Sequence, residues 1–303
     1  MSASSPTRNP NLVTADDFRA ILECFQSCLA RFEAQINDLN VYPVPDSDTG
    51  TNALVTVRAG RAGLPEASGE ARSLATDVQT FAQSAGLSAL GNSGTILAEY
   101  FRGLASELSA SATGTDWHRA LAAASRYAFE AVSAPVAGTI LTVADAIANT
   151  KPQSDLPSLL TEVRTAAKSE LMATTAQLPQ LASAGVVDAG ALVLVLFHEC
   201  VASHFNDHEI EMAYAFNSEQ TSISETYDGP DNELTFLLDA DETVRDALVA
   251  GLAVLGESLT ITRSGQQFKV HIHTDLIPEV LELVANFGPV TSVTTTTLTA
   301  LAD

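Results

Sequence analysis

Residues 40–52 read Asn40-Val-Tyr-Pro-Val-Pro-Asp-Ser-Asp-Thr-Gly-Thr-Asn52, the densest set of reactive side chains in the sequence. Two prolines stiffen the first half and exclude helix there. Asp46 and Asp48 follow with one residue between them, so their carboxylate oxygens can converge on one hard cation. The last four residues supply hydroxyls and a helix start, where free N–H groups favour an anion such as phosphate. The spacing fits two interpretations equally: a site for a metal and a phosphate, or an acidic turn that caps a helix.

Helical hydrophobic spacing lies on both sides of this stretch. Before it, apolar residues recur every three or four positions from Phe18 to Ile36, after an N-cap at Thr14 with acidic residues in the first turn. After it, the same spacing predicts helices over 51–63, 71–85, 95–108, 117–132, 139–148, 155–176 and 189–204. We therefore expect residues 13–205 to form an all-α domain of about eight helices.

Three further turns in this region precede helices and resemble one another in composition. They are Leu-Gly-Asn-Ser-Gly-Thr at 90–95, Pro-Val-Ala-Gly-Thr-Ile-Leu-Thr-Val at 135–143 and Ala-Gly-Val-Val-Asp-Ala-Gly at 184–190. Each combines small residues with the unpaired N–H groups of a helix start, which favour anions. A single turn of this kind is common at helix starts and does not by itself indicate a binding site. Four of them, counting residues 40–52, can lie at one end of a helical bundle and form one pocket.

The hydrophobic period changes in the last third of the chain. Residues 206–231 are polar and predict a partly extended linker. Strands are predicted over 233–238, 259–262, 268–274 and 290–298, and helices over 243–255 and 278–287. The resulting order, βαββαβ, is the split βαβ arrangement, so residues 232–303 are predicted to form a ferredoxin-like α+β domain. Residues 1–12 are predicted to be a disordered tail.

The amino-acid composition disfavours several classes of binding partner. The 303 residues include 37 acidic and 15 basic side chains, a net charge of −22, which disfavours binding to nucleic acid and to anionic membrane surfaces. A phosphate ligand would need a metal ion or backbone dipoles, because basic side chains are scarce. The N-terminal sequence lacks the apolar core of a signal peptide, and apolar runs are too short for a membrane span. We therefore expect a cytoplasmic protein without membrane insertion.

The chain contains three cysteines, Cys24, Cys28 and Cys200. An odd number does not fit a secreted disulfide framework. Cys24 and Cys28 are four residues apart in a helical pattern and share a face. Packing as small buried hydrophobic residues is the simpler interpretation, with metal binding as the alternative.

Taken together, the four turns resemble the DhaL or DAK2 nucleotide-binding domain of the dihydroxyacetone kinase family. Within it, the sequence is most similar to the fatty acid kinase A subunits, the YloV-like proteins. The matching residues are 40–52, Gly91-Asn-Ser-Gly94, Pro135 with Gly138-Thr-Ile-Leu-Thr-Val143, and Ala184-Gly-Val-Val-Asp-Ala-Gly190. The resemblance continues into Lys269-Val-His-Ile-His-Thr-Asp275 and Pro278-Glu-Val-Leu281, which look like the middle domain of those subunits.

This resemblance implies an antiparallel eight-helix barrel that binds ATP with Mg²⁺ at one end and transfers the γ-phosphoryl group. The acceptor would be a small hydroxyl or carboxyl substrate, held in some members by an acyl-carrying or substrate-binding partner protein; a homodimer is compatible with this. The implied catalytic residues are Asp46 and Asp48, which with the weaker candidate Asn40 would hold Mg²⁺. The implied ATP-binding residues are Thr49, Gly50, Thr51, Asn52, Gly91, Asn92, Ser93, Gly94, Gly138, Thr139, Asp188 and Gly190.

A second metal site is suggested in the last third of the chain. His271 and His273 alternate on a predicted strand, so both point to one face of the sheet. In some fatty acid kinase A subunits the matching pair binds zinc with a cysteine, and Glu233 stands at that cysteine position here. Two histidines and a glutamate are a reasonable zinc ligand set. Two half-exposed histidines on a sheet face are an equally good interpretation.

Three positions depart from the pattern that the resemblance leads us to expect. Ser47 replaces a glycine between the two aspartates, Leu90 stands in place of an arginine, and Ala137 in place of a glutamate. Serine at a position that needs positive φ costs about 1 kcal/mol. An alternative function is therefore a catalytically weakened, nucleotide- or metal-binding regulatory module. The resembling subunits carry a further C-terminal domain, so the phosphoryl acceptor is not assigned.

Overall fold

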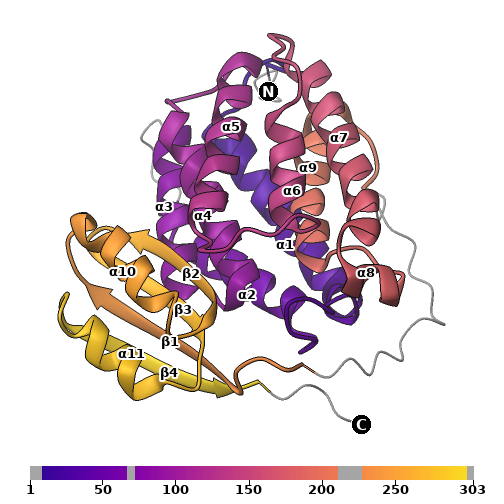
Figure 1. Ribbon diagram of the computed structural model, residues 1–303. Helices are drawn as coiled ribbons and strands as arrows, with labels where there is room; N and C mark the ends of the chain where they lie inside the picture. The colour runs from indigo at the N-terminus through magenta and orange to yellow at the C-terminus, as the bar shows by residue number, and fades with distance from the viewer. Residues whose placement is uncertain (1–8, 67–71, 211–226, 299–303) are drawn as a thin grey trace.

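The computed structural model describes residues 9–66, 72–210 and 227–298 (Figure 1). A mostly helical N-terminal part is followed by a small α+β part with a four-stranded sheet, as the sequence predicts. Residues 1–8 of the predicted tail and 211–226 of the predicted linker lie outside the described residues. Residues 9–12 form a turn rather than a disordered tail, and Val13 pairs with Ala112.

The helices of the N-terminal part pack in sequence order. They are α1 (Ala15–Asp38), α2 (Thr49–Ala62), α3 (Leu74–Ser88), α4 (Gly91–Glu107), α5 (Gly114–Glu130), α6 (Ile140–Ala148), α7 (Leu156–Gln177), α8 (Pro179–Ala184) and α9 (Ala189–Asn206). Each of α1 to α7 contacts the next, α7 contacts α9, and α9 contacts α1. Within the described residues, eight helices therefore form a closed ring, and the short α8 is attached to α7. Six residues are too few for periodicity to reveal, which is why α8 was not predicted.

Aromatic side chains fill the ring. Phe18, Phe81 and Phe101 meet edge to face, with 4.7 Å between the ring centroids of Phe81 and Phe101. Phe197 of α9 continues the cluster, 4.9 Å from Phe101 and 5.5 Å from Phe25. Such geometry adds to the hydrophobic stabilisation from burial. These contacts join the first, third, fourth and last helices into one core.

Helix α9 is enclosed by the other helices, and residues 189–202 are all buried. By length and composition it would suffice to cross a membrane, which corrects the sequence-based expectation that every apolar run is too short. Its burial, 78% of that stretch, is the arrangement of a core helix.

The α+β part contains β1 (Asn232–Asp239), the 3₁₀ turn η1 (Glu242–Val244), α10 (Arg245–Leu252), β2 (Glu257–Ser264), β3 (Gln267–His273), α11 (Ile277–Val284) and β4 (Val290–Thr297). The strand order is β2-β3-β1-β4, and every neighbouring pair is antiparallel. This is the split βαβ order that the sequence predicts.

Alternation along the strands gives the sheet two different faces. Leu234, Phe236, Phe268 and Val270 are among the buried side chains that share a hydrophobic core with α10 and α11. Residues of opposite parity on β3 point to the other face, because successive side chains alternate. That face lies against the ring near α2, α3 and α4, as Figure 1 shows. The sheet therefore turns polar residues of β3 toward the helical part.

Several polar contacts fix the sheet on the ring. The Lys269 ammonium donates to the carbonyl oxygens of Leu87, at 3.1 Å, and of Ala89, at the end of α3. The Thr262 hydroxyl donates to the buried carboxylate of Glu99 on α4. Main-chain bonds join the edge of β2 to the residues after α5, since Ser133 donates to Leu259 and Ile261 donates to Ala131.

We predict that Lys269→Met destabilises the protein by about 1–3 kcal/mol, because two carbonyl oxygens at the interface lose a charged donor. The control is Lys151→Met, at an exposed position, where the free energy of unfolding should change by no more than about 0.5 kcal/mol. Denaturant unfolding measures both. Equal stabilities for the two variants would show that Lys269 does not hold the sheet on the ring.

Candidate functional site

Two adjoining cavities lie at the end of the ring that holds residues 40–52. The larger has a volume of about 370 Å³ and the smaller about 40 Å³. They share five wall residues, Tyr42, Pro43, Thr49, Asn92 and Ser93. The larger is within the size range of small-molecule pockets, and the smaller has room for ions or a phosphoryl group. The pair therefore suits a ligand with a bulky body and a compact charged end.

The loop between α1 and α2 presents two carboxyl groups to the smaller cavity. Asp46 and Asp48 both line it, and they are close enough to share a hydrogen bond. Ser47 between them has φ of 55°, the left-handed conformation that glycine adopts most easily. The loop therefore takes a conformation that brings the two carboxyl groups together, even with serine at this position.

Asn40 supports the loop from behind. Its amide nitrogen donates to the carbonyl oxygen of Val44, at 2.9 Å, and to Asp46 Oδ1. Its amide oxygen accepts from the Thr49 hydroxyl. Since both ends of this buried amide are occupied, Asn40 is placed to position Asp46, whereas the sequence predicts a metal ligand there.

The surroundings disfavour two negative charges on this loop. Burial, followed by the neighbouring Asp48, raises the pKa of Asp46 to about 7. Burial also raises the pKa of Asp48, while a hydrogen bond from Asn52 favours its charged form. Around both cavities, the described wall residues include no lysine or arginine. A bound cation would therefore supply the missing positive charge.

The sheet closes the other side of the smaller cavity. Glu233 of β1 and the two histidines of β3, His271 and His273, all line it. One ligand atom from each of the three lies within 4.8 Å of the others. His271 Nδ1 lies 3.3 Å from Glu233 Oε1, and neither of its buried ring nitrogens has a hydrogen-bond partner among the described residues. Burial, followed by His271, lowers the pKa of His273 to about 4, so this imidazole is neutral at pH 7.

The start of α4 forms the wall between the cavities. Gly91 has φ of 58°, and a Cβ there would lie 2.7 Å from Asn52 Nδ2, so the chain approaches Asn52 as closely as only glycine allows. Asn92 Oδ1 is buried and has no partner within the described structure. The first-turn N–H groups of a helix favour anions. Because α4 begins at Gly91 and not at 95, these residues belong to the helix itself.

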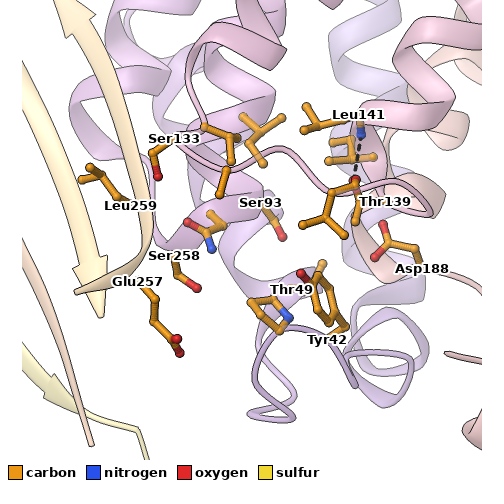
Figure 2. Close-up of a pocket in the computed structure, with 18 of the residues that line it drawn as sticks. Tyr42, Thr49, Ser93, Ser133, Thr139, Leu141, Asp188, Glu257, Ser258 and Leu259 are labelled. Carbon is orange, nitrogen blue, oxygen red and sulfur yellow. Dashed lines mark hydrogen bonds between the residues drawn. The ribbon is translucent and has the colours of Figure 1, made fainter. Parts of the chain in front are cut away.

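The larger cavity has a mostly apolar wall with a few polar groups. Figure 2 shows Thr139 and Asp188 on one side, Glu257, Ser258 and Leu259 on the opposite side, and Tyr42 and Thr49 between them. Thr139 caps α6, with its hydroxyl accepting from the Leu141 N–H at 3.3 Å. Asp188 caps α9, accepting from the Ala191 N–H at 2.6 Å, and burial raises the pKa of Asp188 to about 7. Gly190 follows it in the wall.

Four residues with a predicted role in binding ATP do not line either of the two cavities. The N–H groups of Gly50 and Thr51 both donate to Asn37 Oδ1 on α1. A Cβ at Gly94 would lie 2.5 Å from the Thr56 hydroxyl, so this glycine allows α4 to pack on α2. Gly138 has φ of 85° and shapes the turn before α6. These four do not line the described cavities, whereas the remaining residues predicted to bind ATP border them.

Sequence reasoning missed the contribution of the α+β part to the larger cavity. Glu257, Ser258 and Leu259 come from β2, at a bulge where Ser258 has φ of 52°. Tyr227 reaches the wall from the segment before β1, and its hydroxyl donates to Glu257 at 2.9 Å. A positive φ in a strand is not visible in the sequence. The serine after Glu257 carries no signal that would mark a bulge.

Comparison with known proteins identifies both parts of the chain. The family model of the DAK2 domain matches residues 43–203, more than half of the chain. The chain belongs to the DAK2 domain family. Residues 231–302 match a second model, the middle domain of fatty acid kinase A-like subunits. The DAK2 match begins within the carboxylate loop and runs from α2 into α9, and the second match covers the four-stranded sheet with α10 and α11.

Individual bacterial proteins are also similar to this chain in sequence. Protein YloV of Bacillus subtilis is 28% identical over 283 residues, which cover 86% of this chain and 51% of YloV. An uncharacterized protein of Staphylococcus saprophyticus is 27% identical over 84% of this chain and 49% of its own length. One of Mycoplasma genitalium is 34% identical over 58% of this chain and 34% of its length. The chain spans about half the length of the first of these relatives. The two matches place the chain among proteins that combine a DAK2 domain with a fatty acid kinase A-like middle domain.

We predict that the metal-free DAK2 domain loses stability as pH rises toward 7 because of Asp46. The pKa of this carboxyl is about 7 in the folded protein and 3.8 ordinarily, so between these values the folded state keeps a proton that the unfolded chain has lost. Its contribution therefore falls as pH rises and is constant above 7. The side chain in the Asp46→Asn variant does not titrate in this range. The melting temperature of the variant minus that of wild type should therefore be larger at pH 8 than at pH 5.

Thermal unfolding in a chelator at both pH values measures this difference. Asp145→Asn is the control, because Asp145 is exposed on α6. The account of Asp46 is wrong if its replacement changes the melting temperature equally at the two pH values.

Proposed function

We propose that the protein is an ATP- and Mg²⁺-dependent kinase component. The observation that carries this proposal is the pairing of Asp46 and Asp48 in a cavity whose described walls hold no lysine or arginine, next to a larger and mostly apolar cavity. The DAK2 match supports the same function. We further infer that the closed ring is the antiparallel eight-helix barrel of this family, and that residues 13–205 and 232–303 are its two domains.

The proposed arrangement of ATP follows the polarity of the two cavities. Ile96, Val136, Ile140 and Leu141 would cover the base and ribose in the larger cavity. The triphosphate would extend past Ser93 and Asn92 into the smaller cavity, toward the carboxylates. The start of α4 contributes N–H groups, which stabilise anions without a formal charge.

The donor set in the smaller cavity fits Mg²⁺. Asp46 and Asp48 offer the oxygen ligands that this ion prefers, and water and phosphate oxygens complete its coordination in kinases. When held by Asp46 and Asp48, Mg²⁺ would neutralise negative charge on the phosphates. Asn52, hydrogen-bonded to Asp48, favours the ionised carboxylate that such a role needs. Asn40 holds Asp46 in position through its amide nitrogen.

In the proposed reaction, the bond between the γ-phosphorus and its oxygen bridge to the β-phosphate breaks, and ADP leaves with that electron pair. An oxygen of the acceptor bonds to phosphorus in its place. A hydroxyl acceptor also loses a proton to a base, whereas a carboxylate acceptor needs none. The fatty acid kinase A-like middle domain supports a small hydroxyl or carboxyl acceptor held by a separate partner protein, and a cytoplasmic location suits such a reaction.

A regulatory, catalytically weakened module is the second candidate function. It is favoured by Leu90, which stands exposed at the start of α4 where an arginine is expected, and by exposed Ala137 where a glutamate is expected. Losing a positive charge next to phosphates weakens electrostatic stabilisation of the transferred group. This candidate keeps ATP binding and lacks phosphoryl transfer.

Calorimetric titration with ATP tests the binding step. We predict binding that requires Mg²⁺, and a loss of at least about tenfold in affinity, or 1.4 kcal/mol, in Asp48→Asn. The exposed Asp145→Asn should bind as wild type does. ATP binding without Mg²⁺, or the same ATP affinity in Asp48→Asn as in wild type, would contradict the proposal. Release of ADP that depends on Asp48 distinguishes a kinase from a regulatory module, which binds without turnover.

We also propose that Glu233, His271 and His273 bind Zn²⁺. Their ligand atoms lie within 4.8 Å of one another, and the unpaired nitrogens of His271 support a ligand in this position. We predict that zinc-equilibrated His271→Ala carries one equivalent less zinc than wild type, measured by elemental analysis after dialysis. The control His118→Ala, on α5, should keep the wild-type content. Equal zinc in wild type and His271→Ala would exclude this site.

A further inference from the structure

The cysteines come together at a place that the proposed kinase site does not use. Cys24 and Cys28 lie on α1 and Cys200 lies on α9, where the first and last helices of the ring meet. The cysteines lie about 15–21 Å along their helices from the ends that border the cavities, at a rise of ~1.5 Å per residue. This cluster is therefore separate from the carboxylate loop and from the histidines of the sheet.

The spacing of the sulfur atoms is that of a ligand set. Cys28 Sγ and Cys200 Sγ are 3.8 Å apart, and the three sulfur atoms all lie within 4.8 Å of one another. Around a tetrahedral zinc ion with Zn–S bonds of about 2.3 Å, two sulfur atoms are separated by about 3.8 Å. The pair from different helices already has this separation. Cys24 shares a helix face with Cys28 and needs to move by about 1 Å at most, a shift that rotation of a half-buried side chain can supply.

We propose that Cys24, Cys28 and Cys200 bind a thiophilic d¹⁰ cation, Zn²⁺ or Cu⁺, that links the first and last helices of the ring. Thiolates are the ligands that select these ions over Mg²⁺. Among the described residues, this metal-ligand group contains three protein ligands. Zn²⁺ would complete a tetrahedron with water, and Cu⁺ would be held by the thiolates alone.

The exposure of the three cysteines agrees with this assignment. Cys24 and Cys28 are half-buried, so a cation can reach them from solvent, while Cys200 is buried at the base of the site. Binding releases one proton from each thiol that is not already ionised, so the three thiolates and Zn²⁺ together carry a charge of −1.

The consequence for the protein is a cross-link that closes the ring. Helices α1 and α9 are far apart in the sequence, and a shared cation would resist their separation. A ligand that binds the folded chain alone stabilises it by mass action, by an amount that grows with its concentration over Kd. The site would therefore raise the melting temperature without touching the ATP site.

Titration of the reduced full-length chain with Cd²⁺, a spectroscopic substitute for Zn²⁺, tests the proposal. Cadmium–thiolate bonds give an ultraviolet charge-transfer band, which histidine and carboxylate ligands do not produce. We expect the band to saturate at one equivalent in His271→Ala and to reach the same final intensity in wild type. In Cys200→Ser we expect the affinity to fall by more than the roughly tenfold that loss of an outer-shell partner costs. Zinc should raise the melting temperature of His271→Ala, and it should not do so in the double variant that combines His271→Ala with Cys200→Ser.

A second measurement does not depend on how the serine variant folds. Mass spectrometry counts the alkylated cysteines of wild type with and without the cation, and all three should be protected in its presence. Elemental analysis of the protein as purified, followed by competition with Cu⁺ chelators, separates Zn²⁺ from Cu⁺. No band in wild type, unprotected thiols, or a band that Cys200→Ser leaves unchanged would each overturn the proposal.

Discussion

Two carboxyl groups that face each other in a half-buried cavity are the constraint on which the site depends. The pKa of Asp46 is raised to about 7 because burial and Asp48 both oppose its ionisation. The loop is nevertheless held in this form by Asn40, Thr49 and the left-handed Ser47. Two carboxyl groups held together at a cost to metal-free stability support the proposal that a cation binds here. In a chain with a net charge of −22, the proposed cation would also supply the counter-charge for the proposed phosphate ligand.

The two domains converge on this loop from opposite sides. The ring contributes the helix starts at α4, α6 and α9, and the sheet contributes one face of β3. Strand alternation is what allows this, because it sends the hydrophobic residues of β3 to α10 and α11 and turns Lys269, His271 and His273 toward the ring. Lys269 anchors the sheet, while the histidines reach the carboxylate cavity. Any movement of the middle domain would therefore change the proposed ATP site directly.

Much of this arrangement could be predicted from the sequence, for identifiable reasons. Long periodic helices such as α1 and the alternating strands leave strong patterns, and Gly91 and Asp188 stand at helix starts that the small-residue turns mark. Two spatial relations between residues could not be predicted from the sequence. The histidines were treated as separate from Asp46, because nothing along the chain says which face of a sheet meets which end of a bundle. Cys200 was likewise not connected with Cys24 and Cys28, since closure of the ring between α1 and α9 is a tertiary event.

The most direct test of the central claim is a crystal structure of the full chain with a non-hydrolysable ATP analogue and Mn²⁺ in place of Mg²⁺. Anomalous scattering would locate the ion without reference to any assumed geometry. The account predicts a manganese peak within bonding distance of Asp46 and Asp48 and of the terminal phosphates, with the base in the larger cavity. A nucleotide outside that cavity, or an ion that contacts neither aspartate, would contradict it.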